Sequence, residues 1–261
     1  MGNGAERPGV FHLRLRAGSP GFWFVLIALS VLPLTVTAES EKDFDKMRRN
    51  LVEEIADEVR LTSEYLNKRE LDKRVMDAIG RVPRHELVPK AVREQSYGNF
   101  PLPIGYGQTI SQPYVVAVMT DMLEIRSGDR VLEVGTGSGY QAAVIAELGA
   151  TVYTIEIIEE LAASAKTNLA RLGYHNVHIR HADGYYGWEE HAPYDAIIIT
   201  AATSHIPPPL IEQLRPGGKM MLPLGGQFMT QHLVLVDKSA DGEITTRQIL
   251  PVRFVPLTGD R

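Results

Sequence analysis

The chain has 261 residues, of which 44% are hydrophobic, and it carries a formal net charge of −5. This length suits one large α/β domain with appendages. The acidic balance argues against a nucleic-acid partner. The chain contains no cysteine, which excludes disulfides, a thiolate nucleophile and cysteine-ligated zinc.

The first 38 residues have the layout of a secretory signal peptide. Three arginines precede an uncharged run over residues 22–36, and small residues follow up to Ala38. A basic start, a short apolar run and a small-residue end are typical of such a leader. Two alternatives stay open: a membrane anchor that is not cleaved, or a start site placed too far upstream, with Met47 as the true start. Residues 1–38 are therefore set apart from the fold.

Residues 39–104 are expected to form a helical N-terminal cap in front of an α/β core over residues 105–261. Apolar residues at helical spacing predict a helix over 51–66, with Glu and Lys on its other face. A second helix is predicted over 70–79, with Gly80 as its C-terminal cap. Four prolines then interrupt the chain before the core begins.

The segment LPIGYGQTISQPY, residues 102–114, combines turn formers with small hydroxyl and amide groups. Pro113 suits the first position of a helix, which places Ser111 or Gln112 at the N-cap. Ser111 has two compatible interpretations: an N-cap, or a polar group aimed into a ligand cleft. The helix is expected to continue over 115–123.

An apolar strand next runs into a glycine-rich turn with Gly135, Gly137 and Gly139, and a helical pattern follows over 141–148. This is the first β-α unit of a nucleotide-binding α/β fold. Glycine lets the chain turn tightly and lets a ligand lie against bare backbone. The helix start offers free N–H groups to polar ligand atoms. Tyr140 replaces the third glycine of a dinucleotide fingerprint, which argues against an NAD-type oxidoreductase.

Strands and helices alternate along the rest of the chain. The predicted elements are strands over 151–155, 177–180, 194–200 and 219–224, helices over 158–172 and 211–214, and a turn over 215–218. Two further strands, over 231–238 and 244–254, flank the hairpin signal Asp241-Gly242. The pattern predicts an α/β fold of the Rossmann-like type: a doubly wound, mostly parallel sheet with an antiparallel edge.

Acidic residues stand at the ends of two predicted strands. Glu156 ends the strand after the glycine turn, where a carboxylate can accept from both hydroxyls of a ribose. Asp183, followed by Gly184, comes after the next strand and can accept from an adenine amino group. Glu133 opens the motif E-V-G-T-G-S-G. This motif with an acidic end to the second strand resembles the S-adenosylmethionine-dependent methyltransferases.

Narrower motifs make the chain resemble the protein-L-isoaspartate O-methyltransferase family over roughly residues 50–258. The resemblance rests on RHELVP at 84–89, QTIS at 108–111, LEVGTGSGYQAA at 132–143, PGG at 216–218 and VRFVPL at 252–257. The QTIS and VRFVPL segments separate this family from other methyltransferases. The resemblance implies an enzyme that uses S-adenosyl-L-methionine to methylate the free carboxylate of L-isoaspartyl residues in damaged proteins and peptides.

The resemblance also assigns site residues. Ser111 matches the active-site serine. The cofactor positions are Gly135, Gly137, Glu156, Asp183 and Gly184, to which the glycine motif adds Glu133 and Gly139. The positions that line the substrate are Thr109, Ile110 and Val255. The family further implies isoaspartyl-containing proteins and peptides as partners, and a monomer.

Methyl transfer to an ionised carboxylate requires correct alignment of the reacting groups and does not require a strong base. The acceptor carboxylate, with an unperturbed pKa of about 4, is ionised at neutral pH. A hydroxyl and backbone N–H groups orient such an anion, whereas an arginine clamp would hold it too well in the ground state. We therefore expect Ser111 to orient the carboxylate without acting as a nucleophile. The eight histidines lack paired metal-ligand spacing, so no metal is expected.

Alternatives remain for the acceptor and for the location. The chain could methylate another carboxylate or a small molecule, or bind the cofactor without turnover. The segment Thr200–Thr203 lacks the Pro-Pro-aromatic pattern of enzymes that methylate DNA amino groups. Cofactor supply favours the cytoplasm, whereas the apolar run within residues 22–38 favours a periplasmic or membrane-anchored protein.

Overall fold

The structure is a computed structural model that describes Met1 and residues 33–226 and 229–259. The chain divides into two units, Met1–Glu39 and Ser40–Arg261. Most of the expected leader lies outside the described residues. Within the described part, no helix combines the length and the apolar character needed to cross a membrane.

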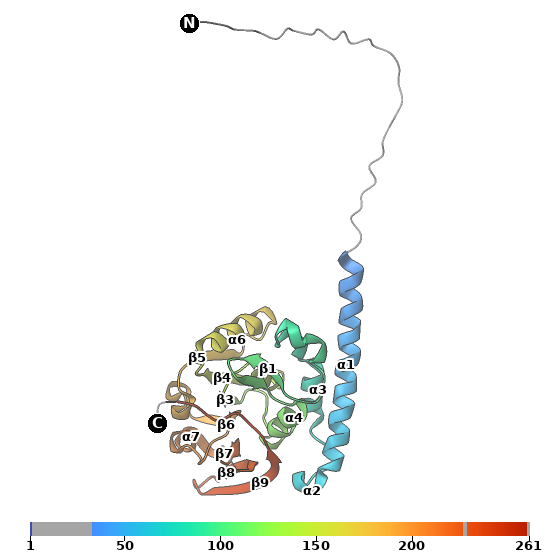
Figure 1. Cartoon of the computed structure of the whole chain (residues 1–261). Coiled ribbons are helices and arrows are strands. Elements are labelled where there is room, and N and C mark those ends of the chain that lie inside the picture. The colour runs from blue at the N-terminus through green and yellow to red at the C-terminus, as the bar shows by residue number, and fades with distance from the viewer. Residues whose placement is uncertain (2–32, 227–228, 260–261) are drawn as a thin grey trace. The chain divides into compact units, whose positions relative to one another are not determined.

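A seven-stranded sheet forms the centre of the second unit, in the order β5-β4-β3-β6-β7-β8-β9 (Figure 1). Its strands are β3 (Arg130–Val134), β4 (Thr151–Glu156), β5 (Val177–His181), β6 (Tyr194–Ile199), β7 (Leu214–Leu224), β8 (Gln231–Lys238) and β9 (Ile244–Val252). The strands from β5 to β7 run parallel, and β8 and β9 add an antiparallel edge. The predicted doubly wound fold is confirmed.

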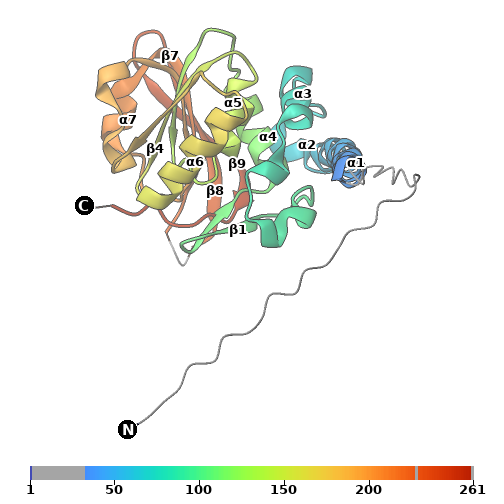
Figure 2. The same cartoon turned by 90° about the horizontal axis from the view of Figure 1, so that it is seen from above.

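Side chains alternate between the two faces of the sheet and build a core on each. On β3, Val131 belongs to one core, and Leu132 and Val134 belong to the other. The first core includes α4 (Pro113–Met122) and α5 (Tyr140–Ala146), and the second includes α7 (Pro208–Gln213). Figure 2 shows α7 on one side of the sheet and α4 on the other. Because both faces are covered, the central strands β3 and β6 are buried over most of their length, whereas β5, at the edge of the sheet, carries His178 and Arg180.

Eight further helices complete the described part of the chain. They are α1 (Pro33–Leu61), α2 (Ser63–Leu66), α3 (Lys73–Arg81), α6 (Glu159–Arg171) and the 3-10 helices η1 (Arg84–Glu86), η2 (Lys90–Gln95), η3 (Gly184–Tyr186) and η4 (Glu189–His191). The single helix expected over 51–66 is interrupted at Thr62, and Asn67 in the left-handed conformation ends its second part. The interruption was not evident from the apolar spacing, which continues through it.

The prediction of Gly80 as a helix cap is wrong. Gly80 lies inside α3, which continues to Arg81 and ends at the extended residue Val82. The residue before a proline avoids the helical region, so Pro83 sets this boundary. A Cβ on Gly80 would lie 3.6 Å from Val52 Cγ2, an ordinary van der Waals contact, so the packing on α1 does not itself require glycine here.

Two segments expected as turns contain strand structure. Within 102–114, β1 (Leu102–Gly105) and β2 (Gln108–Ile110) form an antiparallel hairpin. Residues 215–218 belong to β7 and form a bulge, because Leu214 pairs with Tyr194 but the next pair is Lys219 with Ala196. Leu214 therefore begins a strand and is not helical.

Candidate active site

The glycine-rich turn follows β3 and needs glycine at each of its three positions. Gly135, Gly137 and Gly139 all have positive φ, at 98°, 53° and 86°. A Cβ on Gly135 would overlap the hydroxyl of Thr200, and one on Gly139 would lie 2.8 Å from Leu169 Cδ1. The turn therefore brings bare main chain to the end of the sheet, where Gly135 and Gly137 line a pocket.

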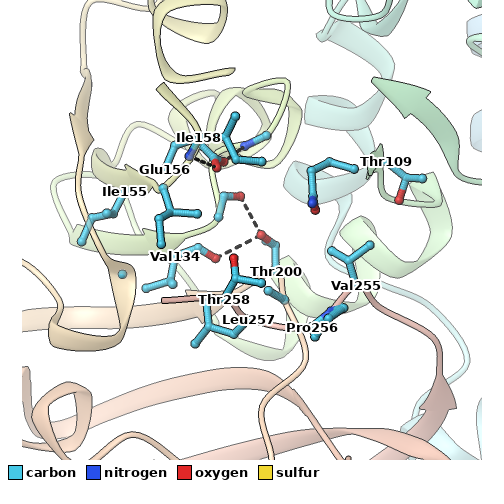
Figure 3. Close-up of a pocket in the computed structure, with 16 residues that line it drawn as sticks. Thr109, Val134, Ile155, Glu156, Ile158, Thr200, Val255, Pro256, Leu257 and Thr258 are labelled. Atoms are coloured by element: carbon cyan, nitrogen blue, oxygen red, sulfur yellow. Dashed lines mark hydrogen bonds between the residues drawn. The ribbon is translucent and has the colours of Figure 1, made fainter. Parts of the chain in front are cut away.

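Glu156, at the end of β4, lies in the same pocket with its carboxylate held in place (Figure 3). Its Oε2 accepts a hydrogen bond from the Gly137 N–H at 2.7 Å, and its Oε1 accepts from the Ile158 N–H at 3.0 Å. Each carboxylate oxygen has a second lone pair. Glu156 is thus a fixed acceptor next to the glycine turn, as the strand-end position predicted.

Glu133 lies beneath the turn and does not line the pocket. It is fully buried, and its Oε2 accepts from the Thr154 hydroxyl at 2.5 Å. Thr154 also bonds the Thr136 hydroxyl at 2.6 Å, which links Glu133 to the turn. Burial, aided by the nearby Glu156 charge, raises the pKa of Glu133 to about 8. Glu133 is therefore mostly protonated at neutral pH and supports the turn from below.

Asp183 and Gly184 follow β5, and of the two only Gly184 lines the pocket. Asp183 Oδ1 accepts from the Tyr185 N–H at 2.9 Å, whereas its buried Oδ2 has no partner among the described residues. Gly184 lines the pocket, and a Cβ there would lie 2.5 Å from Val134 Cγ1. An unpartnered buried acceptor needs a donor. The adenine amino group expected at this position would supply one.

The C-terminal segment closes the pocket on the side opposite Glu156. Figure 3 shows Val255, Leu257 and Thr258 along this side, with Thr200 next to them. The Ala202 N–H donates to the Val255 carbonyl and the Leu257 N–H donates to the Ala202 carbonyl, both at 2.8 Å. The segment is thereby fixed to the end of β6.

A second pocket, of about 360 Å³, adjoins the first. Thr109, Thr200 and Val255 line both pockets, so they form the boundary between them. Ser111 lines the second pocket, and it also lines a small cleft with Ile110 and the glycine turn. Of the predicted substrate residues, Thr109 and Val255 lie at the boundary, and Ile110 is largely buried.

Ser111 presents an unengaged hydroxyl to this boundary. The N-cap of α4 is Gln112, so the interpretation of Ser111 as the cap is wrong. Neither the Ser111 hydroxyl nor the backbone N–H of Ser111 or Gln112 donates a hydrogen bond to another described residue. Three donors are therefore available beside the cofactor pocket.

Comparisons with known proteins agree with this geometry. Residues 57–261 match the family model described as Protein-L-isoaspartate(D-aspartate) O-methyltransferase. The chain belongs to this family. A Protein-L-isoaspartate O-methyltransferase 2 from Syntrophobacter fumaroxidans is 56% identical over 241 residues, which cover 92% of this chain and 98% of the relative.

Further relatives extend the match to the whole methyltransferase fold. A Protein-L-isoaspartate O-methyltransferase 2 from a Polaromonas species is 61% identical over 211 residues, which cover 81% of this chain and 100% of the relative. A solved protein-L-isoaspartate O-methyltransferase superimposes with a TM-score of 0.70 at 28% identity, covering 80% of this chain and 66% of that one.

The fold of this family member also brings together pocket residues that sequence reasoning missed. Glu58, on α1, lines the second pocket and accepts from the Asn99 amide at 2.6 Å and from the Gln112 amide at 3.4 Å. Tyr65 and Arg253 line the same pocket. Partial burial raises the pKa of Glu58. Helical spacing had placed Glu58 on a solvent-facing polar side, and no local signal distinguishes it from its neighbours.

Proposed function

We propose that this protein transfers a methyl group from S-adenosyl-L-methionine to the free carboxylate of L-isoaspartyl residues in damaged proteins and peptides. The observation that carries the proposal is the unengaged Ser111 hydroxyl at the junction of the two pockets. Membership of the isoaspartate methyltransferase family supports the same reaction.

The residues of the first pocket fit the cofactor. Glu156 would hold the ribose hydroxyls, and the main chain at Gly135 and Gly137 would lie against the rest of the molecule. Asp183 Oδ2, which lacks a partner among the described residues, would accept from the adenine amino group beside Gly184. When bound, the cofactor supplies a methyl group on a sulfonium that is already activated for transfer.

The chain's own residues orient the acceptor. The Ser111 hydroxyl and the neighbouring backbone N–H groups donate to the substrate carboxylate and fix one of its oxygens for attack. The described residues that line the small cleft at Ser111 include no arginine or lysine that could clamp the carboxylate, so the anion keeps its nucleophilic character there. The C-terminal segment from Val255 to Thr258 limits the access of water to the junction.

The proposal also covers the domain roles, the oligomeric state, the partners and the cellular location of the enzyme. Residues 39–104 act as the helical cap that helps form the substrate pocket, and residues 105–261 act as the methyltransferase core. The protein works as a monomer on isoaspartyl-containing proteins and peptides, without nucleic acid. Because its cofactor is made in the cytosol, we place the activity in the cytoplasm; a periplasmic or membrane-anchored location through residues 22–38 is the alternative.

Two matched peptides test the reaction. The full chain is incubated with radiolabelled S-adenosylmethionine and with peptides that differ only in one L-isoaspartyl or normal L-aspartyl linkage. We expect base-labile methyl ester on the isoaspartyl peptide alone. Label on neither peptide, despite measurable cofactor binding, would overturn the substrate assignment and leave another carboxylate or a small molecule as the acceptor.

A further inference from the structure

Arg84 is a buried arginine with no acidic partner. It is 0% exposed, and no acidic side chain among residues 43–226 and 229–259 forms an ion pair with it. Burial lowers its pKa to about 10, so the guanidinium stays charged at neutral pH. An unpaired buried charge is costly. Its place near the active site therefore calls for an explanation.

The guanidinium of Arg84 donates hydrogen bonds to three backbone carbonyls. Nη1 donates to the Ser96 carbonyl at 2.9 Å, and Nη2 donates to the Ser111 carbonyl at 2.9 Å and to the Phe100 carbonyl at 3.3 Å. Its carbon also lies 5.2 Å from the ring centre of Tyr140, the first residue of α5 after the glycine turn. Arg84 therefore connects the substrate segment with the cofactor segment.

The contact with Ser111 determines where the next N–H points. In a trans peptide the C=O and N–H groups point in opposite directions. Since the Ser111 carbonyl faces Arg84, the Gln112 N–H faces away from it, and Gln112 lines the substrate pocket. A charged donor on the carbonyl also polarises the peptide unit, which makes that N–H a stronger donor.

The geometry points to Arg84 as the positioning residue for the substrate carboxylate. It fixes the Ser111–Gln112 peptide from behind, so that the Ser111 hydroxyl and the Gln112 N–H meet the anion together. Its positive charge lies one peptide unit from the carboxylate and favours its binding without touching it. The inference deepens the proposed function and rests on it, because it assumes that a carboxylate binds at Ser111.

A double-mutant cycle distinguishes positioning from a general structural role. Arg84→Lys keeps the charge but cannot reach three carbonyls at once. We expect kcat/KM for the isoaspartyl peptide to fall about 10- to 50-fold, with the Kd for S-adenosylhomocysteine within twofold of wild type. Adding Arg84→Lys to Ser111→Ala should lower kcat/KM by a smaller factor than Arg84→Lys does in the wild type, because only the Gln112 N–H is then left to be positioned.

An exposed arginine provides the matched control. Arg74 pairs with Asp72 outside both pockets, so Arg74→Lys should leave kcat/KM and the Kd within twofold of wild type. Independent, multiplying effects of Arg84→Lys and Ser111→Ala would overturn the inference. An equal loss of S-adenosylhomocysteine affinity in Arg84→Lys would also overturn it, because that result describes a general loss of structure.

A measurement on the wild-type chain keeps the inference testable if Arg84→Lys does not fold. With S-adenosylhomocysteine bound, the amide NMR signal of Gln112 should shift downfield on addition of the isoaspartyl peptide and stay in place with the aspartyl peptide. An unmoved Gln112 signal while the isoaspartyl peptide binds would overturn the inference alone. If the wild type did not discriminate between the peptides, the proposed function would fail and the inference with it.

Discussion

The two pockets meet at Thr200 but are built in different ways. The cofactor side is built mainly from short segments at the ends of adjacent parallel strands, namely the glycine turn after β3, Glu156 on β4 and Gly184 after β5, and the C-terminal segment closes it. The substrate side draws on residues far apart in the chain, such as Glu58, Ser111 and Arg253. The first depends on local backbone geometry, and the second depends on tertiary packing.

This difference predicts which substitutions impair cofactor binding and which impair binding of the methyl acceptor. A change in the glycine turn alters backbone that no other residue can replace, so it should affect cofactor binding first. A change in the substrate pocket removes one side chain from a set of several, so it should affect the acceptor and leave cofactor binding intact. Substitutions in each pocket test whether cofactor binding and acceptor binding respond separately.

The largest effect is expected from Gly135→Ala. The new Cβ would overlap the Thr200 hydroxyl at a φ of 98°, so the turn must shift or Thr200 must leave its place. We expect S-adenosylhomocysteine affinity to fall by more than about 100-fold, which corresponds to roughly 3 kcal/mol. Isothermal titration calorimetry measures the change.

Gly173→Ala is the control for strain alone. Gly173 has a φ of 85° but open space around a new Cβ. The substitution should lower stability by about 1 kcal/mol and leave cofactor affinity within twofold of wild type. Similar affinity losses in the Gly135 and Gly173 variants would show that strain, and not the pocket, is responsible.

A second prediction concerns the buried Glu133, whose pKa is about 8 in the folded chain against 4.5 for an unperturbed glutamate. At pH values between 4.5 and 8, the Glu133 carboxyl is ionised in the unfolded chain and protonated in the folded chain. The contribution of Glu133 to the free energy of unfolding therefore falls as pH rises from about 4.5 to 8. Glu133→Gln removes this dependence while retaining an oxygen acceptor for Thr154.

Urea unfolding of both proteins at pH 5.5 and pH 8 tests the role of Glu133. Moving to pH 8 should lower the stability of the wild type relative to Glu133→Gln by roughly 1–4 kcal/mol. The other titrating groups are shared and cancel in the difference. An unchanged difference between the two pH values would mean that Glu133 is ionised in the folded protein.

The smallest effect is expected from Glu58→Gln, on the substrate side. Glu58 is a partly buried carboxylate that should favour a lysine next to the isoaspartyl residue of the peptide. Its replacement should raise KM for a lysine-containing peptide about 2- to 5-fold, as expected for a partly exposed charge pair, and leave an alanine peptide unchanged. Glu54→Gln, one turn earlier on α1 and outside the pocket, should change neither KM. An equal rise for both peptides would contradict a charge preference.

The sequence predicted the parts of the molecule that depend on local rules. The seven strands follow from apolar runs and turn residues, and the glycine turn, Glu156 and Asp183 follow from where parallel strands end. Gly80 shows the limit of such rules, because a glycine near the end of a helix can lie inside it, as Gly80 does in α3. The break at Thr62 likewise left no trace in the apolar spacing.

The rest of the site could not be predicted because it exists only after folding. Glu58 looks like any acidic residue on a helix until α1 packs beside Asn99 and Gln112. The Ser111 hydroxyl was identified through its motif, yet its freedom from capping depends on Gln112 occupying the N-cap. The burial of Arg84 against three carbonyls depends on chain segments up to 27 residues away.

The most direct test is Ser111→Ala, measured for both functions in the full chain. We predict that kcat/KM for an L-isoaspartyl peptide falls about 10- to 100-fold, the cost of one hydrogen bond to a charged group. The Kd for S-adenosylhomocysteine should stay within twofold of wild type, because Ser111 lies on the substrate side of the boundary. Full kcat/KM in this variant would contradict the role of Ser111, and a parallel loss of cofactor affinity would contradict the separation of the two pockets.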